Sequence, residues 1–121
     1  MLTYLNSGSR NYYSRPVSTY TRGVWEFQAV ISGSIAPVFQ GNSSEKLRQN
    51  TLWLFPPDGA HGWRGQKAHP AEILVFHFSK ITIELDQLCR EKGNLSIELD
   101  NSDISFLKEK YGLDVTWSTY A

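Results

Sequence analysis

The segment from residue 51 to residue 79 constrains the fold more than any other part of the chain. It contains two apolar runs, residues 51–55 and 72–78, that are rich in β-branched and aromatic residues. Runs of this length and composition are typical of strands with two buried faces. The segment therefore predicts two strands that lie deep in the fold.

A corner rich in proline and glycine separates the two runs. Pro56 and Pro57 cannot donate to a β-ladder, so the first strand should end there. Residues 58–59, Asp-Gly, are a turn signal, because glycine accepts a positive φ and aspartate hydrogen-bonds its own backbone. This geometry predicts that His61 and Trp63 lie just past a strand end, which in a barrel is the mouth.

Composition limits the class of protein. A chain of 121 residues fits one domain with a modest core. Its formal charge is zero, with 12 basic and 12 acidic residues, so it carries no electrostatic signature of a polyanion-binding protein. Cys89 is the sole cysteine, which excludes an internal disulfide and suits a reducing compartment. No apolar run approaches membrane-spanning length, and we expect a cytoplasmic protein with no membrane partner.

These features, taken in order, resemble the N-terminal effector-binding domain of AraC-type transcription regulators. The resemblance rests on the strand with its proline pair, on His61 followed by an aromatic residue, and on a strand that ends in Phe-His-Phe at residues 76–78. It extends back to the strand and turn of residues 24–34 and to Leu-Arg at residues 47–48. Residues 49–51 depart from the Pro-Gly-Asp turn of the family. The similarity covers roughly residues 15–112.

The resemblance implies a fold and a domain organisation. The fold is mainly β, a cupin or jelly-roll barrel with one or two short C-terminal helices. Residues 1–19 would form an N-terminal arm able to close over bound effector, and residues 20–100 the barrel. Residues 101–121 would form a helix and tail that lead to a DNA-binding domain outside this chain. The resemblance also implies a homodimer that contacts DNA only through that helix-turn-helix domain.

The residues themselves indicate most of the secondary structure. Residues 20–31 alternate with a period of two, which predicts a packed face (Trp25, Phe27, Ala29, Ile31) and a solvated face (Glu26, Gln28). Residues 35–39 should form an edge strand because they contain Pro37, and residues 43–48 a weak polar strand. A helix should follow residue 81 and stop at Gly93, with a short strand at residues 95–99. A capped helix should then run to Gly112.

A small-molecule effector in the barrel is the binding partner that the resemblance implies. In such domains an aromatic residue at the place of Trp63 can stack on the ligand, and an apolar ring beside a donor suits sugars and flat organic molecules. The candidate ligand-binding residues are His61, Trp63, His77, Trp25, Arg22 and Trp53.

Each candidate also has a purely structural interpretation. His61 either bonds a backbone carbonyl at the corner or donates to an effector hydroxyl or carboxylate. His77 faces either core or cavity. Trp25 and Trp53 either fill the core or line the cavity. Arg22 either pairs with an anionic effector or is a solvated charge before a strand.

Metal binding and catalysis have little support in the sequence, so no metal, cofactor or catalytic residue is predicted. His61, His69 and His77 stand eight residues apart, and the His-x-His pair of metal-binding cupins is absent. Cys89 has no nearby histidine, and no Gly-x-Ser-x-Gly turn occurs. The leading hypothesis is a ligand sensor. The alternative is a stand-alone small cupin, with a metal-dependent isomerase or oxygenase as one form of it. A dimeric interaction module without a ligand is the third hypothesis.

Overall fold

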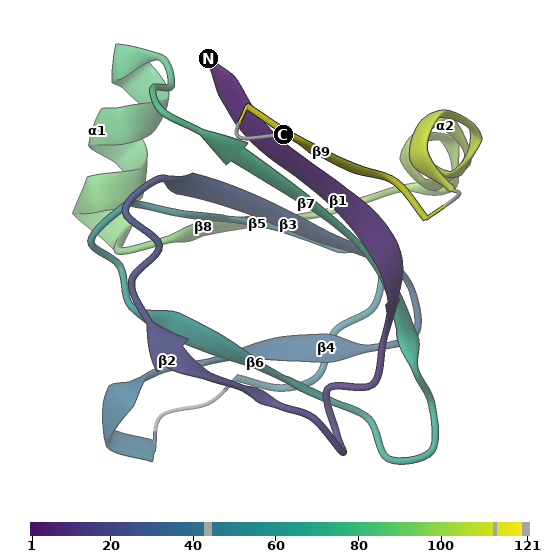
Figure 1. The fold of residues 1–121 in the computed structure, drawn as a ribbon. Helices are drawn as coiled ribbons and strands as arrows, with labels where there is room; N and C mark the ends of the chain where they lie inside the picture. Colours follow the sequence, from purple (N-terminus) through teal and green to yellow (C-terminus); the bar gives the residue numbers. More distant parts are fainter. Residues whose placement is uncertain (43–44, 113, 120–121) are drawn as a thin grey trace.

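The computed structural model describes residues 1–42, 45–112 and 114–119, and it is built around two antiparallel β-sheets that face each other (Figure 1). In the described residues the larger sheet has the order β8-β5-β3-β7-β1-β9 and the smaller sheet has the order β2-β6-β4. The strands are β1 (Leu2–Arg10), β2 (Val17–Tyr20), β3 (Trp25–Ser32), β4 (Ile35–Val38), β5 (Thr51–Phe55), β6 (His61–Gly65), β7 (Ala71–Phe78), β8 (Leu95–Glu98) and β9 (Thr116–Ser118). The prediction of a mainly β, barrel-like fold with two short helices is confirmed.

The centre of the larger sheet consists of the apolar segments that the sequence singles out. Strand β3 lies between β5 and β7, and its residue Glu26 pairs with Phe55 on one side and His77 on the other. Strand β5 ends at Phe55, directly before the two prolines. Strand β3 ends at Ser32, and Gly33 then takes a φ of 78° in the turn to β4. That left-handed conformation is open to glycine at little cost.

Two helices cover the outer face of the larger sheet (Figure 1). Helix α1 (Ile83–Lys92) begins at Thr82, whose hydroxyl accepts from the backbone of Leu85, and ends at Gly93 with a φ of 89°. Helix α2 (Asn101–Tyr111) begins with a reciprocal capping box between Asp100 and Asp103. Both helices were predicted from the sequence, and they end at the predicted residues, Gly93 and Gly112. No helix in the described part of the chain is long and apolar enough to cross a membrane.

The segment expected to be an arm is built into both sheets. Strand β1 pairs with β7 from Leu2 to Arg10 and with β9 on its other side, while β2 pairs with β6. The barrel therefore begins at β1 and not at residue 20. Polar groups of β1 have partners across the sheet: the Asn6 amide donates to the Thr116 hydroxyl at 2.7 Å, and the Ser7 hydroxyl accepts from the backbone of Val115 at 3.0 Å.

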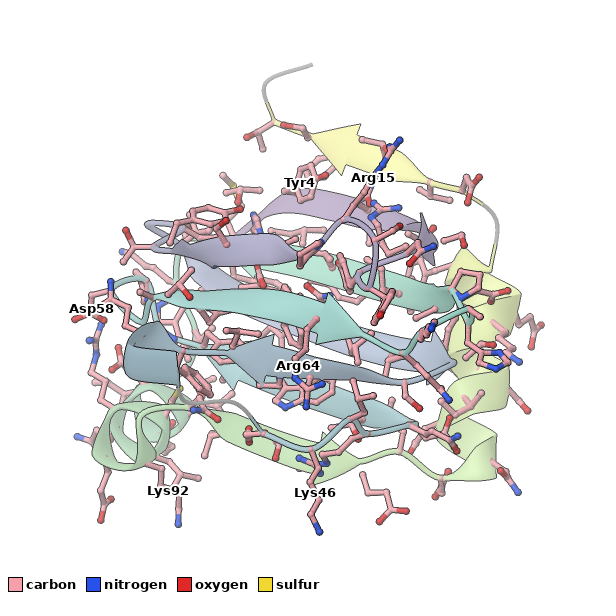
Figure 2. All side chains as sticks on the ribbon, turned by 90° about the horizontal axis from the view of Figure 1, so that it is seen from below. Tyr4, Arg15, Lys46, Asp58, Arg64 and Lys92 are labelled. Carbon is pink, nitrogen blue, oxygen red and sulfur yellow. The ribbon has the colours of Figure 1, made fainter. Side chains whose placement is uncertain are left out.

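The connection between β4 and β5 also differs from expectation. Residues 43–48 were predicted as a weak strand, but Ser43 and Ser44 lie outside the described residues, and residues 45–47 form no strand. Arg48 alone makes an isolated bridge to Ile35. Strand β4 lies at the edge of the smaller sheet, as Pro37 predicts. Figure 2 views the molecule from the side of this smaller sheet, which carries Arg64 on β6.

Candidate functional site

The interior of the barrel has a filled half and a hollow half. The filled half, here called the aromatic cluster, consists of Trp53, Phe55 and Trp63, all at most 1% exposed, packed edge to face. The hollow half holds a cavity of about 370 Å³, here called the polar cavity. This volume lies in the range of about 300–1,000 Å³ that is usual for ligand pockets. The polar cavity is therefore the candidate site.

The sheet register sets out the wall of the polar cavity in rows. One row runs across three strands of the larger sheet as Tyr4, His77 and Glu26. The next row is Asn6, Val75 and Gln28. The remaining lining comes from β1, β2, β6, β7 and the loops between strands: Arg10, Tyr12, Val17, Tyr20, Arg22, Trp63 and Ile73. Residues that pair across neighbouring strands have adjacent side chains, so each row is a line of neighbours on one face of the sheet. Because side chains alternate along a strand, successive rows on this face are two residues apart.

Glu26 is the centre of the polar contacts in this cavity. The residue is 4% exposed, and its Oε1 lies 2.8 Å from Nε2 of His61. Its Oε2 lies 2.8 Å from Nε2 of His77 and 3.2 Å from Nε of Arg22. A buried carboxylate is stable only when it is paired and hydrogen-bonded. Three strands and the loop before β3 thus meet at one carboxylate.

Both ring nitrogens of His61 have partners. Its Nδ1 lies 3.1 Å from the carbonyl oxygen of Gly59, and its Nε2 lies 2.8 Å from Oε1 of Glu26. The contact with Gly59 fits the structural interpretation of His61, a bond to a backbone carbonyl at the corner. His61 thus supports Glu26 from behind, without belonging to the lining of the cavity.

The same contacts keep Glu26 ionised. Burial acts to raise the pKa of the Glu26 carboxyl, but hydrogen bonds from His61 and His77 and the positive charge of Arg22 outweigh it and lower the pKa from 4.5 to about 2. Hydrogen bonds to the charged form of an acid favour that form. The cavity therefore contains a permanent negative charge at neutral pH that its neighbours already balance.

Arg22 is not the solvated charge that its place before a strand suggests. Its side chain is 5% exposed, and Nη1 donates to the carbonyl oxygen of Tyr20 at 2.6 Å and to that of His61. Its guanidinium also lies 3.8 Å from the centre of the Tyr20 ring. Its buried Nε has no hydrogen bond among the described residues, although it lies 3.2 Å from Oε2 of Glu26. Arg22 thus joins β2 to β6 and lines the cavity.

His61 and Trp63 lie deeper than the predicted rim. The prediction placed both residues in the corner after the first strand, but they belong to strand β6, which begins at His61. Both residues are 1% exposed. His61 stacks on Phe55 with ring centres 3.6 Å apart, and Trp63 stands beside Tyr12 at 6.5 Å. Trp63 lines the polar cavity, but its indole N–H is itself buried and, like that of Trp53, has no hydrogen-bond partner among the described residues. An N–H that is buried in this way does not face the cavity, so the ring of Trp63 and not its N–H forms part of the wall.

Three predicted ligand-binding residues do not line the polar cavity: His61, Trp25 and Trp53. Trp25 points outward from β3 and packs with Leu54 and Cys89 beneath α1. Its outward direction follows from alternation, because its neighbour Glu26 points inward. Trp53 lies in the aromatic cluster and is 0% exposed, so it supports the wall without lining the cavity. His77, by contrast, lines the cavity, and its side chain is 20% exposed.

The expectation of a solvated face on β3 is wrong. Glu26 is 4% exposed and Gln28 2% exposed, and both line the polar cavity. The Gln28 amide donates to the Tyr12 hydroxyl at 3.1 Å. The sequence analysis also missed the cavity residues Tyr4, Asn6, Arg10 and Tyr12, all in the segment taken for an arm, and Tyr20 directly after it. Their signal is a run of alternating polar and aromatic residues without an apolar face.

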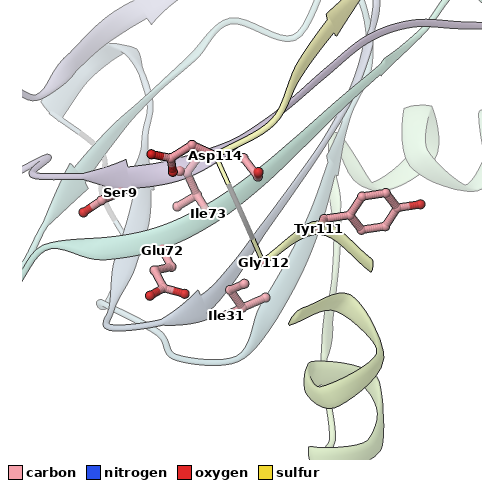
Figure 3. A pocket seen from close by; sticks show the side chains of 9 residues that line it. Ser9, Ile31, Glu72, Ile73, Tyr111, Gly112 and Asp114 are labelled. Carbon is pink, nitrogen blue, oxygen red and sulfur yellow. The ribbon is translucent and has the colours of Figure 1, made fainter. Parts of the chain in front are cut away.

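A second, smaller pocket of about 90 Å³ lies where the end of α2 meets β1 and β7 (Figure 3). Glu72 and Asp114 contribute carboxylates to it, and both residues are exposed. None of the described buried polar atoms that lack a hydrogen bond belongs to this pocket. The described residues also contain no group of three His, Cys, Asp or Glu side chains placed to hold a metal ion. The polar cavity remains the stronger candidate.

Sequence comparisons find no relatives: no family model matches the chain, and no curated protein matches it. Solved structures share its fold. An apo variant of ToxT from Vibrio cholerae matches 88% of this chain over 46% of its own length, with a TM-score of 0.62 and 11% identity. Wild-type ToxT from Vibrio cholerae with bound unsaturated fatty acid matches 93% over 47%, with a TM-score of 0.60 and 12% identity.

A third structure is ToxT from Vibrio cholerae bound to (E)-4-(8-methylnaphthalen-1-yl)but-3-enoic acid, which matches 91% of this chain over 48% of its own length, with a TM-score of 0.60 and 9% identity. ToxT is an AraC-type regulator, so the chain has the fold of the N-terminal domain of such regulators, and the resemblance seen in the sequence is confirmed at the level of fold. The chain spans about half the length of these structures.

Proposed function

We propose that this chain is the effector-sensing domain of an AraC-type transcription regulator and that it binds a small organic molecule in the polar cavity. The observation that carries the proposal is a cavity of about 370 Å³ inside a fold shared with ligand-bound ToxT. A barrel of this size is normally filled by side chains. A hollow half lined by hydrogen-bonding groups therefore indicates a ligand.

The other parts of the proposal follow from the fold relationship. DNA binding would belong to a helix-turn-helix domain outside this chain, and the protein would act as a homodimer in the cytoplasm. An effector shifts such a protein between states only by its differential affinity for them. Sensing therefore requires cavity residues whose contacts change on binding, and His77, Arg22 and Tyr20 are placed for this because they lie on three different segments.

A thermal-shift screen of the purified chain tests the proposal. Small organic acids, sugars and aromatic metabolites are added one at a time, and a ligand raises the melting temperature as its concentration passes Kd. Val75→Phe places a ring in the cavity and should abolish each shift. Ile97→Phe, at a side chain 58% exposed on β8, is the matched control and should keep it. Shifts that survive Val75→Phe would place the ligand elsewhere and contradict the proposal.

The same screen separates the sensor from the small-enzyme hypothesis. Fe²⁺, Mn²⁺ and Zn²⁺ are each added without organic ligand, and the protein is analysed for bound metal. One tightly held equivalent of metal would favour the enzyme. The sensor predicts that organic molecules stabilise the protein without added metal.

A further inference from the structure

Beyond the existence of a ligand, we propose that the polar cavity selects a compact, polar organic anion: a small carboxylate that carries hydroxyl or amide groups or an aromatic ring. This inference rests on the proposed function and adds the chemical class of the ligand. It excludes the long alkyl chain of a fatty acid, which is the ligand in one of the similar ToxT structures.

Charge is the first argument. The lining contains two guanidinium groups, of Arg10 and Arg22, and one carboxylate, of Glu26. The carboxylate is already saturated by His61, His77 and Arg22. The lining therefore has one more guanidinium group than it has carboxylates. The half-buried guanidinium of Arg10 supplies this extra charge, and a guanidinium binds a carboxylate through charge-assisted hydrogen bonds.

The two guanidinium groups reach the cavity from different segments of the chain. Arg22 lies at the row of Glu26, with its Nε 3.2 Å from Oε2 of that residue. Arg10 starts further along β1, opposite Ala71, but its side chain folds back and donates to the amide oxygen of Asn6. Asn6 lies one row along the sheet from Glu26 and two strands across it, on β1 with β7 between them. The two cations therefore line different parts of the cavity wall, and a small carboxylate can be held at either of them.

The polarity of the wall is the second argument. Its aliphatic members are Val17, Ile73 and Val75, and the rest of the lining carries hydroxyl, amide, guanidinium, imidazole, carboxylate or indole groups. An alkyl chain would strip water from these groups without replacing its hydrogen bonds, which costs free energy for each group. A ligand with several oxygens can replace these hydrogen bonds.

The outer face of the same sheet provides a contrast. A groove of about 270 Å³ between the two helices has a wholly apolar lining, formed by Phe27, Ala29, Leu52, Phe76, Phe78 and Leu107. An alkyl chain is compatible with this surface. A binding experiment must therefore report which site a fatty acid occupies.

Isothermal titration of the whole chain with matched pairs of probes tests the inference. Gluconate is compared with sorbitol, and para-hydroxybenzoate with para-hydroxybenzamide, because each pair differs at the carboxylate. We expect at least one acid to bind about tenfold or more tightly than its neutral partner, the difference that one charge-assisted contact supplies. Octanoate and oleate are titrated in parallel and should bind weakly, unaffected by Val75→Phe.

Charge-removing variants locate the effect. Arg10→Gln should remove most of the preference for the acid while leaving the neutral partner unchanged. Arg90→Gln, which removes the same charge on the outer surface of α1, should preserve the preference. Arg22 is less suitable for this test because it also supports Glu26. Circular dichroism confirms that each variant is folded before titration.

The outcomes distinguish this inference from the proposed function. Tight binding of the neutral partners, with no gain from the carboxylate, overturns the anion preference and leaves the sensor intact. Tight binding of oleate that Val75→Phe abolishes overturns the polar ligand class. If no compound in either this set or the wider screen binds, the proposed function itself fails.

Discussion

The two faces of strand β3 differ in a way that separates stability from function. The outer face presents Trp25 and its apolar neighbours to the helices, where they form ordinary core. The inner face presents Glu26 and Gln28 to the polar cavity, where they are as deeply buried as the tryptophan. Burying polar side chains stabilises a fold less than burying apolar ones. A polar face at this depth therefore indicates a site, and substitutions on the two faces should have different consequences.

Deleting residues 1–10 should have the largest effect, because it removes both a strand of the larger sheet and part of the cavity wall. The deletion exposes the edge of β7 over eight paired positions and removes Tyr4, Asn6 and Arg10 from the cavity. An exposed central strand promotes aggregation. We expect a chain that does not fold or that aggregates, as measured by circular dichroism and size-exclusion chromatography. A monomeric, folded product would mean that β1 is a dispensable arm.

Trp25→Ala should lower the free energy of unfolding by about 3–5 kcal/mol, as truncations of large buried side chains do. The residue is 4% exposed, and Arg90 lies over its ring at 5.2 Å. Urea denaturation measures the loss. Ligand affinity of the folded fraction should be unchanged, because the side chain lies on the far face of β3. A specific loss of affinity without destabilisation would place Trp25 in the site after all.

Glu26→Gln should lower the free energy of unfolding by about 3 kcal/mol at neutral pH, because it leaves buried cations without their counter-charge. The pH dependence identifies the cause. Since the pKa of Glu26 falls from 4.5 to about 2 on folding, its contribution is complete above about pH 4.5 and is lost as the pH falls through 2.

Urea denaturation of wild type and Glu26→Gln at several pH values between neutral and 2 provides the measurement. The difference between the two proteins should shrink steadily below about pH 4.5. A difference that stays constant across this range would show that the carboxylate is not ionised in the folded protein.

Gln28→Leu should have the smallest effect on stability, within about 1 kcal/mol, because it exchanges one hydrogen bond for apolar burial. The hydrogen bond lost is the one to the Tyr12 hydroxyl. Binding should respond more strongly than stability, since the substitution removes the Gln28 amide from the cavity wall and leaves Asn6 as the polar member of that row. Titration with the anion that binds wild type best is the check, and an unchanged Kd would remove Gln28 from the site.

Most of the framework could be predicted from the sequence. The strands around Trp53 and Ile73 are continuous apolar runs, and the helices have the stops that glycine and aspartate provide. Two members of the aromatic cluster, Trp53 and Phe55, belong to the first of these runs. These elements are predictable because each of them buries apolar side chains on at least one face. Such a face produces a periodic pattern of apolar residues in the sequence.

The candidate site could be predicted only in part. His61, Trp63, His77 and Arg22 were named in advance, but β1 was taken for an arm because its inner residues line a polar cavity and produce no apolar alternation. The polar face of β3 was read as solvated for the same reason: Glu26 between two aromatic residues has the pattern of a surface strand. Only the partners that tertiary folding brings to it, two histidines and an arginine, make its burial possible.

Strand β9 pairs with β1 from Tyr4 to Asn6, and the amide of Asn6 reaches across to Thr116. A mechanical consequence follows from this pairing. Tension applied to the last strand is transmitted first to the strand that carries Tyr4, Asn6 and Arg10, and only then to the rest of the sheet. A bound ligand that restrains those three side chains would make it harder to detach β9 from β1. Single-molecule pulling from residue 119 would record this as a higher rupture force.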